Sequence, residues 1–320
     1  MQILENFSLQ QSNTLGLPAC ARRYVEVFSE ASAQQLLQSL TPSHLPLLVL
    51  GSGSNIVLAG DVDGLVLRPL LRGIHLLEQD NDRVIVEAMA GEGWHSFVRH
   101  TLTQGWYGLE NLSLIPGTVG AAPVQNIGAY GVEISDVFHS LTAIHLATAE
   151  WREFSPAECA FSYRDSIFKQ QPGQWLITRV RFSLSRRPQL RLDYGDIRNE
   201  LAAAGIDTPS PLLVSDAVMA IRQRKLPDPA VLGNAGSFFK NPVVSAAVFD
   251  ALKARFPGLV AYPQGSDFKL AAGWLIEQAG WKGRSLGRAG CYERQALVLV
   301  NHGGATGAEL LALADAICRD

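Results

Sequence analysis

Long apolar runs and an excess of either charge are both missing from this 320-residue sequence. No apolar stretch approaches the roughly 20 residues of a membrane-spanning helix, so we expect no membrane partner. The N-terminal residues lack the basic start and apolar run of a secretory signal, and we expect a cytoplasmic location. The net charge is −3 and the pI is about 6.2, which provides no basic surface for nucleic acid.

Cysteine is also scarce. Cys20, Cys159, Cys291 and Cys318 lie far apart and form no C-x-x-C pair. This spacing predicts neither a zinc site nor a disulfide framework, and we expect no bound metal. Their expected role is that of small apolar side chains in the core. Apolar residues make up 47% of the chain and charged residues 18%, which is ordinary for a globular protein with a full core.

The pattern of apolar residues predicts many strands and few helices. Expected strands lie at 24–28, 45–50, 56–58, 64–68, 84–89, 137–146, 153–154, 175–184, 189–194 and 295–300. Expected helices lie at 29–40, 94–104, 210–225, 269–279 and 306–318, with Ser29 as an N-cap and a capping box at Thr306. Such an order fits an α+β fold rather than a regular alternation of strands and helices.

The least regular part of the chain is the glycine-rich stretch at 108–131, GLENLSLIPGTVGAAPVQNIGAYG. Neither a helix period nor a strand period survives in it. Ordering this much glycine costs conformational entropy, which is tolerated where backbone must approach something closely. Bare N–H groups could face a ligand there, or the stretch could be a tight buried crossover that needs glycine only for packing. Composition favours neither interpretation.

A second glycine-rich segment is GSGSN at 51–55. A glycine–serine turn between two apolar strands can form a nest of N–H groups suited to a pyrophosphate. It is not the G-x-G-x-x-G turn into a helix that marks the doubly wound dinucleotide-binding fold. Taken alone, the segment is better explained as a hairpin turn.

Two side chains stand where the strand pattern breaks. Arg164, within YRDSIFK at 163–169, could hold a carboxylate or phosphate in its planar fork, although spacing alone favours a surface turn with Asp165. Tyr194 could stack on a ligand or fold over the edge of the core. His95 is expected at the surface or at a helix end rather than in catalysis.

A serine stands in a third motif, GNAGSFFKNP at 233–242. Ser237 has no histidine nearby in the sequence, so a hydrolase nucleophile is not indicated. Its hydroxyl could instead pass a proton to a reacting carbon. The basic residues that end the expected helix at 210–225 are explained by the helix dipole, which favours cations there.

Five motifs therefore occur together and in order. They are GSGSN at 51–55, the stretch at 108–131, YRDSIFK at 163–169, KLPDP at 225–229 and GNAGSFFKNP at 233–242. This set closely resembles the UDP-N-acetylenolpyruvoylglucosamine reductase (MurB) family, flavoenzymes of peptidoglycan precursor synthesis, over nearly the whole chain. Each motif is weak singly, whereas the ordered set is highly specific.

The resemblance implies a two-part FAD-binding domain of the flavin oxidase (PCMH-type) fold and a smaller C-terminal α+β domain that binds the substrate. The expected boundaries are 1–65 for the first FAD-binding subdomain, 66–225 for the second with a tyrosine-bearing insertion, and 226–320 for the C-terminal domain. The substrates are small molecules, a UDP-sugar and NADPH, and we expect a monomer.

The resemblance also assigns residues. Tyr194, Arg222, Lys225, Asn241 and Gln295 match positions that contact the UDP-sugar, and Tyr194 belongs to the form of the family whose tyrosine loop closes over it. FAD would be held mainly by backbone, at Gly51, Ser52, Gly53, Ser54, Asn55, Pro116, Gly117, Thr118, Gly120, Ala121, Gln125, Asn126, Gly128, Ala129, Tyr130 and Gly131.

The implied reaction has two halves. NADPH reduces FAD and leaves, and the enolpyruvyl UDP-sugar then accepts hydride at C3. Arg164 stabilises the negative charge that spreads over C2 and the carboxylate. Ser237 protonates C2 as general acid.

One departure from the family pattern is expected to matter. Members continue past the final helix into a segment resembling LEPEVR, whose glutamate assists the reduction, whereas the sequence given ends at Asp320. We expect that this segment is missing from the sequence given. The alternatives are another FAD-dependent oxidoreductase on the same fold, or a catalytically impaired protein that binds flavin or UDP-sugar without the tail.

Overall fold

The computed structural model describes residues 2–41, 44–194 and 196–320 and divides into two compact units. Unit 1 comprises Met1–Phe7, Ala21–Ser52 and Val62–Arg224. Unit 2 comprises Ser8–Cys20, Gly53–Asp61 and Lys225–Asp320. Two short N-terminal segments therefore belong with the C-terminal part of the chain.

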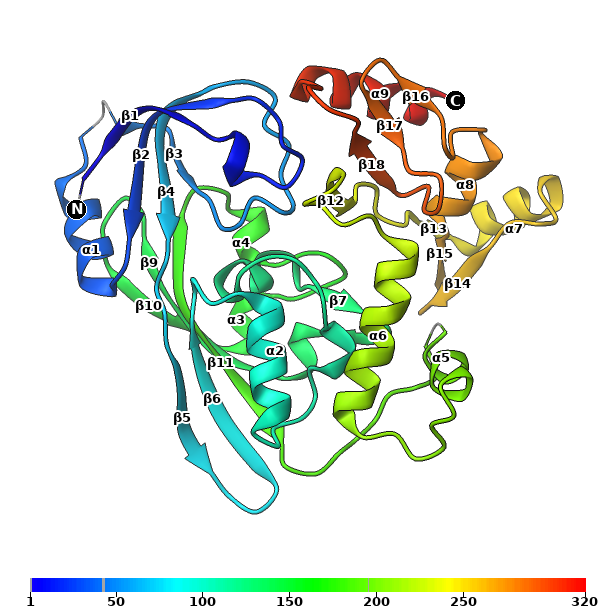
Figure 1. Ribbon diagram of the computed structural model, residues 1–320, viewed down its shortest axis with the longest axis horizontal. Coiled ribbons are helices and arrows are strands. Elements are labelled where there is room, and N and C mark those ends of the chain that lie inside the picture. Colours follow the sequence, from blue (N-terminus) through cyan, green and yellow to red (C-terminus); the bar gives the residue numbers. More distant parts are fainter. Residues whose placement is uncertain (1, 42–43, 195) are drawn as a thin grey trace. The chain divides into compact units, whose positions relative to one another are not determined.

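Unit 1 is built on a four-stranded and a five-stranded sheet, and its described residues also form the short β7–β8 pair (Figure 1). Its strands are β1 (Leu4–Ser8), β2 (Cys20–Val27), β3 (Leu47–Val49), β4 (Val62–Pro69), β5 (Ile74–Gln79), β6 (Arg83–Met89), β7 (Gly128–Ala129), β8 (Val132–Glu133), β9 (Phe138–His145), β10 (Trp151–Phe154) and β11 (Trp175–Ser185). Its helices are α1 (Glu30–Ser39), α2 (Trp94–Thr103), α3 (Pro156–Cys159), α4 (Ile167–Gln170), α5 (Ile197–Ala203) and α6 (Pro211–Lys225), with 3₁₀ turns η3 (Glu110–Leu112), η4 (Val119–Gln125) and η5 (Ile134–Asp136).

The two sheets differ in strand direction. The first has the order β1-β2-β4-β3, and β4 runs parallel to both β2 and β3. The second has the order β10-β9-β11-β6-β5, and all of its neighbouring strands are antiparallel. Its central strand β11 alternates along its length, so that Val180, Phe182 and Leu184 are buried while Arg179 and Arg181 face the other side.

Helix α2 packs on the core of this second sheet. Its buried residues are Trp94, Phe97, Val98, Thr101 and Leu102, which follow the spacing of one helix face. The rings of Trp94 and Phe97 each approach the ring of Phe182, with centroids 6.0 and 4.9 Å apart. Helices α2 and α6 lie side by side (Figure 1). Arg99 of α2 forms a 2.6 Å ion pair with Asp216 of α6.

Unit 2 has smaller sheets. Its strands are β12 (Gly233–Ser237), β13 (Val243–Ser245), β14 (Ala261–Gln264), β15 (Asp267–Leu270), β16 (Ser285–Leu286), β17 (Ala289–Cys291) and β18 (Val298–Asn301). Its helices are α7 (Ala246–Arg255), α8 (Ala272–Gln278) and α9 (Gly307–Arg319), with a 3₁₀ turn η1 (Gln10–Ser12). The sheet orders are β12-β18-β17-β16 and β13-β15-β14. Leu15 and Leu17 join the core formed with α9, which explains why residues 8–20 belong to this unit.

Most expected elements are confirmed. Helix α1 begins after the Ser29 N-cap, α2 and α6 match their expected ranges within a residue, and α9 opens with the capping box of Thr306 and Glu309. The strand expected at 295–300 begins only at Val298.

Several expectations are wrong. Residues 56–58 and 189–194 form no strand, so GSGSN is not a hairpin turn. Lys269 lies in strand β15, and helix α8 starts only at Ala272. Strand β5 and helices α5 and α7 were not expected. The residues of β5 after Ile74 are all exposed and α7 buries no residue, so neither carries a clear apolar period.

Two cysteines also differ from expectation. Cys159 and Cys291 are buried as core residues, but Cys20 and Cys318 are exposed.

Within residues 2–41, 44–194 and 196–320, no helix has the length and apolar character needed to cross a membrane.

Candidate active site

The glycine-rich stretch at 108–131 is held by the connection between β6 and α2. Gly120 and Val119 donate backbone hydrogen bonds to the carbonyls of Ala90 and Glu92, both 2.9 Å long, and Trp94 donates one to the carbonyl of Gly117 at 3.0 Å. A Cβ atom on Gly120 would lie 2.5 Å from the Cβ of Ala90. Packing alone therefore requires glycine at position 120.

Bare backbone donors remain beside this packed segment. Gly51 lies against it, since a Cβ there would be 3.2 Å from Thr118 Oγ1. Among the residues that the structure describes, we find no acceptor for the backbone amides of Gly51, Gly117 and Thr118. Amides grouped in this way fit an anionic group such as the pyrophosphate of a dinucleotide. These residues of unit 1 therefore fit a flavin cofactor.

The end of the stretch forms a two-residue β-hairpin. Tyr130 and Gly131, at its tip, both have positive φ, 51° and 77°. This is the conformation of the hairpin turn whose twist matches the flanking strands. The register places Gly128 opposite Glu133. The two-residue loop in GAYGVE was the sequence signal that could have predicted this pairing.

Arg164 reaches the hairpin from a tight turn. Its backbone is left-handed, with φ 56°, and Ser162 and Asp165 exchange backbone hydrogen bonds of 3.1 Å around it. Its Nη2 donates to the carbonyl of Gly128 at 2.6 Å. Its Nη1 is buried and has no hydrogen-bond partner in the described part of the chain. The turn was thus predicted, but the Arg164 guanidinium does not pair with Asp165, which accepts from Ser166 and Gln170 instead.

Glu133, which the sequence does not single out, lies beside the Arg164 guanidinium. Its Oε1 lies 3.9 Å from Arg164 Nη1, and its Oε2 accepts a 2.7 Å hydrogen bond from Asn126 Nδ2. Asn126 also donates to the carbonyl of Ser162 and accepts from the amide of Ser135. The side chain of Asn126 is therefore fully used within the protein. A Cβ on Gly128 would meet both Glu133 and Arg164 within 3.0 Å, so only glycine fits at this position.

Three more expected site residues lie in unit 1 near the same hairpin. A Cβ on Gly131 would contact Tyr194 Cβ at 3.2 Å, and Tyr194 is 53% exposed. Gly195, which follows it, lies outside the described residues. Arg222 of α6 donates from Nε to the carbonyl of Leu114 at 3.2 Å, and burial lowers the pKa of its guanidinium. Burial also raises the pKa of the Tyr130 phenol, and the Arg222 charge acts on it in the opposite direction.

Unit 2 brings together another group. Ser237 ends β12 opposite Val298, after an irregularity in the pairing that begins at Asn234, and it is exposed. Asn241 accepts a 3.0 Å hydrogen bond from the amide of Ala272 at the start of α8. A Cβ on the next residue, Gly273, would lie 3.4 Å from Gln295 Oε1.

The expected site residues are thus shared between the units. Unit 1 holds Gly51, Ser52 and the cofactor-binding residues expected between Pro116 and Gly131, together with Arg164, Tyr194 and Arg222. Unit 2 holds Gly53, Ser54, Asn55, Lys225, Ser237, Asn241 and Gln295.

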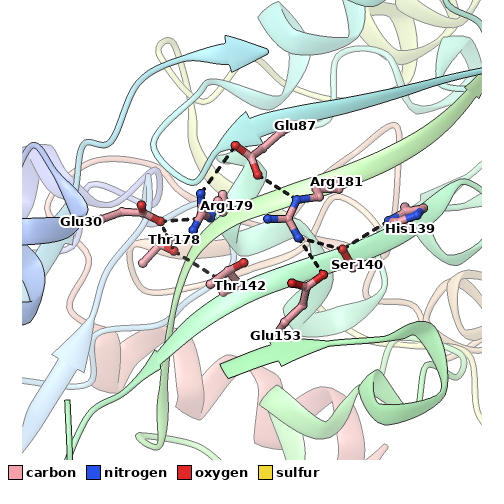
Figure 2. Close-up of polar contacts among 9 residues, drawn as sticks. All are labelled: Glu30, Glu87, His139, Ser140, Thr142, Glu153, Thr178, Arg179 and Arg181. Carbon is pink, nitrogen blue, oxygen red and sulfur yellow. Dashed lines mark hydrogen bonds and ion pairs between the residues drawn. The ribbon is translucent and has the colours of Figure 1, made fainter. Parts of the chain in front are cut away.

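A separate polar cluster lies on the five-stranded sheet of unit 1 and contains none of these residues (Figure 2). Glu87 of β6 forms ion pairs with Arg181 at 2.8 Å and with Arg179 at 3.8 Å. Arg181 also pairs with Glu153 of β10, and Arg179 pairs with Glu30 of α1 at 3.3 Å. These ion pairs connect α1 to the sheet, and we interpret the cluster as structural. Nε of Arg179 is nevertheless buried and has no hydrogen-bond partner in the described part of the chain.

Removing the buried member of this cluster should destabilise the protein far more than removing an exposed one. Glu87→Ala leaves Arg179 and Arg181 short of their shared carboxylate, and we expect the free energy of unfolding to fall by about 3 kcal/mol. Glu153, whose side chain is 59% exposed, pairs with the same Arg181, and Glu153→Ala should cost less than about 1 kcal/mol. Urea unfolding of both variants measures the difference. Equal losses would contradict this account of the cluster.

Comparisons with known proteins follow the same two-part division. A sequence model of the UDP-N-acetylenolpyruvoylglucosamine reductase C-terminal domain matches residues 228–320, and an FAD-binding domain model matches residues 21–155. The crystal structure of UDP-N-acetylenolpyruvylglucosamine reductase (MurB) from Thermus caldophilus superimposes with a TM-score of 0.69 at 24% identity. The alignment covers 100% of this chain and 94% of that one. The expected fold, an FAD-binding domain with a smaller C-terminal domain, is confirmed.

Closer relatives are found by sequence. The UDP-N-acetylenolpyruvoylglucosamine reductase of Pseudomonas fluorescens is 57% identical over 321 residues, which cover 100% of this chain and 95% of that protein. The enzyme of the same name from Bordetella pertussis is 57% identical over 310 residues, covering 96% and 88%. Identity of this extent over the whole chain shows that the protein belongs to the UDP-N-acetylenolpyruvoylglucosamine reductase family.

Proposed function

We propose that this protein reduces UDP-N-acetylenolpyruvoylglucosamine to UDP-N-acetylmuramate in peptidoglycan precursor synthesis, with FAD as cofactor and NADPH as electron donor. Family membership supports the activity, since the relatives bear the name of this reductase. The observation that carries the proposal is the Arg164 guanidinium, which is anchored through Nη2 while its buried Nη1 has no hydrogen-bond partner in the described chain.

The cofactor fits the bare amides of unit 1. Gly51, Gly117 and Thr118 would donate to the pyrophosphate, and the remaining cofactor-binding residues expected at 51–55 and 116–131 would complete the site through their backbone. Asn126 contributes no side chain to it, because that amide is engaged with Glu133, Ser162 and Ser135. Bound FAD would supply the hydride chemistry between NADPH and C3 of the enolpyruvyl group.

Arg164 acts on the charge that appears when C3 accepts hydride. The electron pair then lies on C2 and spreads into the adjacent carboxylate. A guanidinium presents planar, paired donors that match a carboxylate, and a preorganised cation stabilises the charge without reorganising. The bond to the Gly128 carbonyl fixes the fork, and Nη1, which has no hydrogen-bond partner in the described chain, would donate to the substrate.

Ser237 provides the proton that C2 needs. It ends β12 and is exposed there, so its hydroxyl is available as general acid. Tyr194, Arg222, Lys225, Asn241 and Gln295 would bind the UDP-sugar. We assign FAD binding to residues 1–65 and 66–225 and substrate binding to residues 226–320, in a monomeric cytoplasmic enzyme whose partners are small molecules.

One anaerobic titration tests the activity. The purified protein, loaded with FAD, should lose its oxidised flavin spectrum when NADPH is added. It should regain that spectrum when UDP-N-acetylenolpyruvoylglucosamine follows. Bleaching without recovery would point to a different oxidoreductase on this fold, and a protein that binds no FAD would overturn the proposal.

A further inference from the structure

We infer that His95 is a positioning residue for the FAD-binding segment and acts through the backbone of Leu114. The inference rests on the proposed function, because it concerns the same cofactor site. It also predicts that FAD affinity falls in acidic solution. His95 carries out no chemistry itself; it holds the backbone that leads into Pro116–Gly120.

Both backbone polar groups of Leu114 are hydrogen-bonded to side chains of neighbouring helices. Its backbone is left-handed, with φ 58°, which is costly for a large side chain. Its amide donates a 3.0 Å hydrogen bond to Nδ1 of His95, in the first turn of α2. Its carbonyl accepts a 3.2 Å hydrogen bond from Nε of Arg222, on α6. A strained backbone conformation persists only where the surrounding structure holds it. At Leu114 the hydrogen bonds to His95 and Arg222 do this.

The first turn of α2 holds the segment on either side of Leu114 as well. Trp94 donates from its ring Nε1 to the carbonyl of Leu112 at 2.9 Å, and from its backbone to the carbonyl of Gly117 at 3.0 Å. The His95 bond lies between these two along the segment. Loss of that bond would let Leu114 leave the left-handed region and displace the amides of Gly117 and Thr118 that follow.

The hydrogen bond sets the protonation state of His95. Nδ1 accepts from the Leu114 amide, so it carries no proton, and a neutral ring is required. The charged groups around the ring oppose protonation. Burial chiefly lowers the pKa of His95, and the cations Arg99 and Arg222 lower it further. Asp216 of α6 faces Arg99 and pairs with it at 2.6 Å.

Acidification should remove the support that His95 gives to this segment. A histidine whose pKa is lowered in the folded state holds fewer protons there than in the unfolded chain. The contribution of His95 to the stability of the folded state is complete above the ordinary histidine pKa of 6.5. It is lost as the pH falls through the lowered pKa. Below that point, Nδ1 becomes a donor facing the Leu114 amide, and the segment loses its support.

The experiment measures the dissociation constant of FAD for the full chain, by flavin fluorescence, between about pH 7.5 and about pH 5. For the wild type we expect affinity to fall about tenfold once the pH drops below the lowered pKa of His95, the effect of one lost hydrogen bond to a buried group. His95→Leu should bind FAD about tenfold more weakly at pH 7.5, with no further loss on acidification. His95→Asn should restore affinity at both ends of the range, because Oδ1 accepts where Nδ1 did and does not titrate.

His100→Asn is the matched control, since His100 lies on the same helix and contacts Trp106 instead. It should keep the wild-type pH profile. Urea midpoints without FAD separate a loss of cofactor affinity from a loss of fold. A wild-type affinity that is flat with pH, or His95→Leu binding FAD as tightly as the wild type, would overturn the inference while leaving the reductase assignment intact. Absence of FAD binding in every variant and in the wild type would overturn both.

Discussion

Arg164→Lys should slow reoxidation of the reduced flavin by UDP-N-acetylenolpyruvoylglucosamine by about 100- to 1,000-fold. Reduction of the flavin by NADPH should stay near the wild-type rate. In the proposed role the arginine uses two nitrogens at once. Nη2 is bonded to the Gly128 carbonyl, and Nη1, which has no hydrogen-bond partner in the described chain, would donate to the substrate. Lysine has a single nitrogen on a flexible stem and cannot serve both partners.

Stopped-flow measurement of the two half-reactions tests this expectation. Arg187→Lys is the control, because Arg187 is a surface residue whose side chain is 73% exposed and pairs with Asp82. Both of its half-reactions should match the wild type. Arg164→Lys should also bind the substrate more weakly, since it loses a charged hydrogen bond to the carboxylate. Unchanged turnover in Arg164→Lys would remove Arg164 from the mechanism.

Ser237→Ala should slow the same reoxidation by about 100- to 10,000-fold, the usual contribution of a general acid. The reason differs from that for Arg164. The electron pair at C2 can form, but no proton reaches it. Substrate binding should therefore be retained, so that the effect lies in kcat rather than in the dissociation constant. This difference separates the two proposed roles.

Two further variants sharpen the test of Ser237. Ser237→Cys keeps a proton on the side chain and should recover part of the rate. Ser245→Ala is the control in the same unit, because Ser245 precedes α7 without making a side-chain cap. A Ser237→Ala enzyme that is reoxidised as fast as the wild type would show that the proton comes from another group.

The glycine-rich stretch at 108–131 combines the two interpretations, tight packing and amides that face a ligand, at different positions. At Gly120 and Gly128 the packing explanation holds, because a Cβ would collide with Ala90 or with Glu133 and Arg164. At Gly117 and Thr118 the backbone carbonyls are bonded within the fold while the amides have no acceptor in the described residues. Composition records only that glycine is abundant, and cannot separate positions that need space from positions that leave donors bare.

His95 and Glu133 show the limit of reasoning from local sequence. His95 is expected at the surface or at a helix end, and it does lie in the first turn of α2, whereas nothing in the sequence singles out Glu133. The structure places each beside backbone or side chains from distant segments: His95 at Leu114, and Glu133 at Asn126 and Arg164. Exposed Cys20 and Cys318 were misjudged for the same reason, since burial depends on what packs over a residue.

The sequence by itself determined the family and the expectation of a flavin site, because the five motifs keep their order along the chain. It also determined helices such as α1 and α9, whose caps are set by neighbouring residues. Only the tertiary structure decided that residues 8–20 and 53–61 join the C-terminal unit, and that the guanidinium of Arg164 bonds to Gly128 rather than pairing with Asp165. These outcomes depend on contacts between residues far apart in the chain, and such contacts exist only once the whole unit has folded.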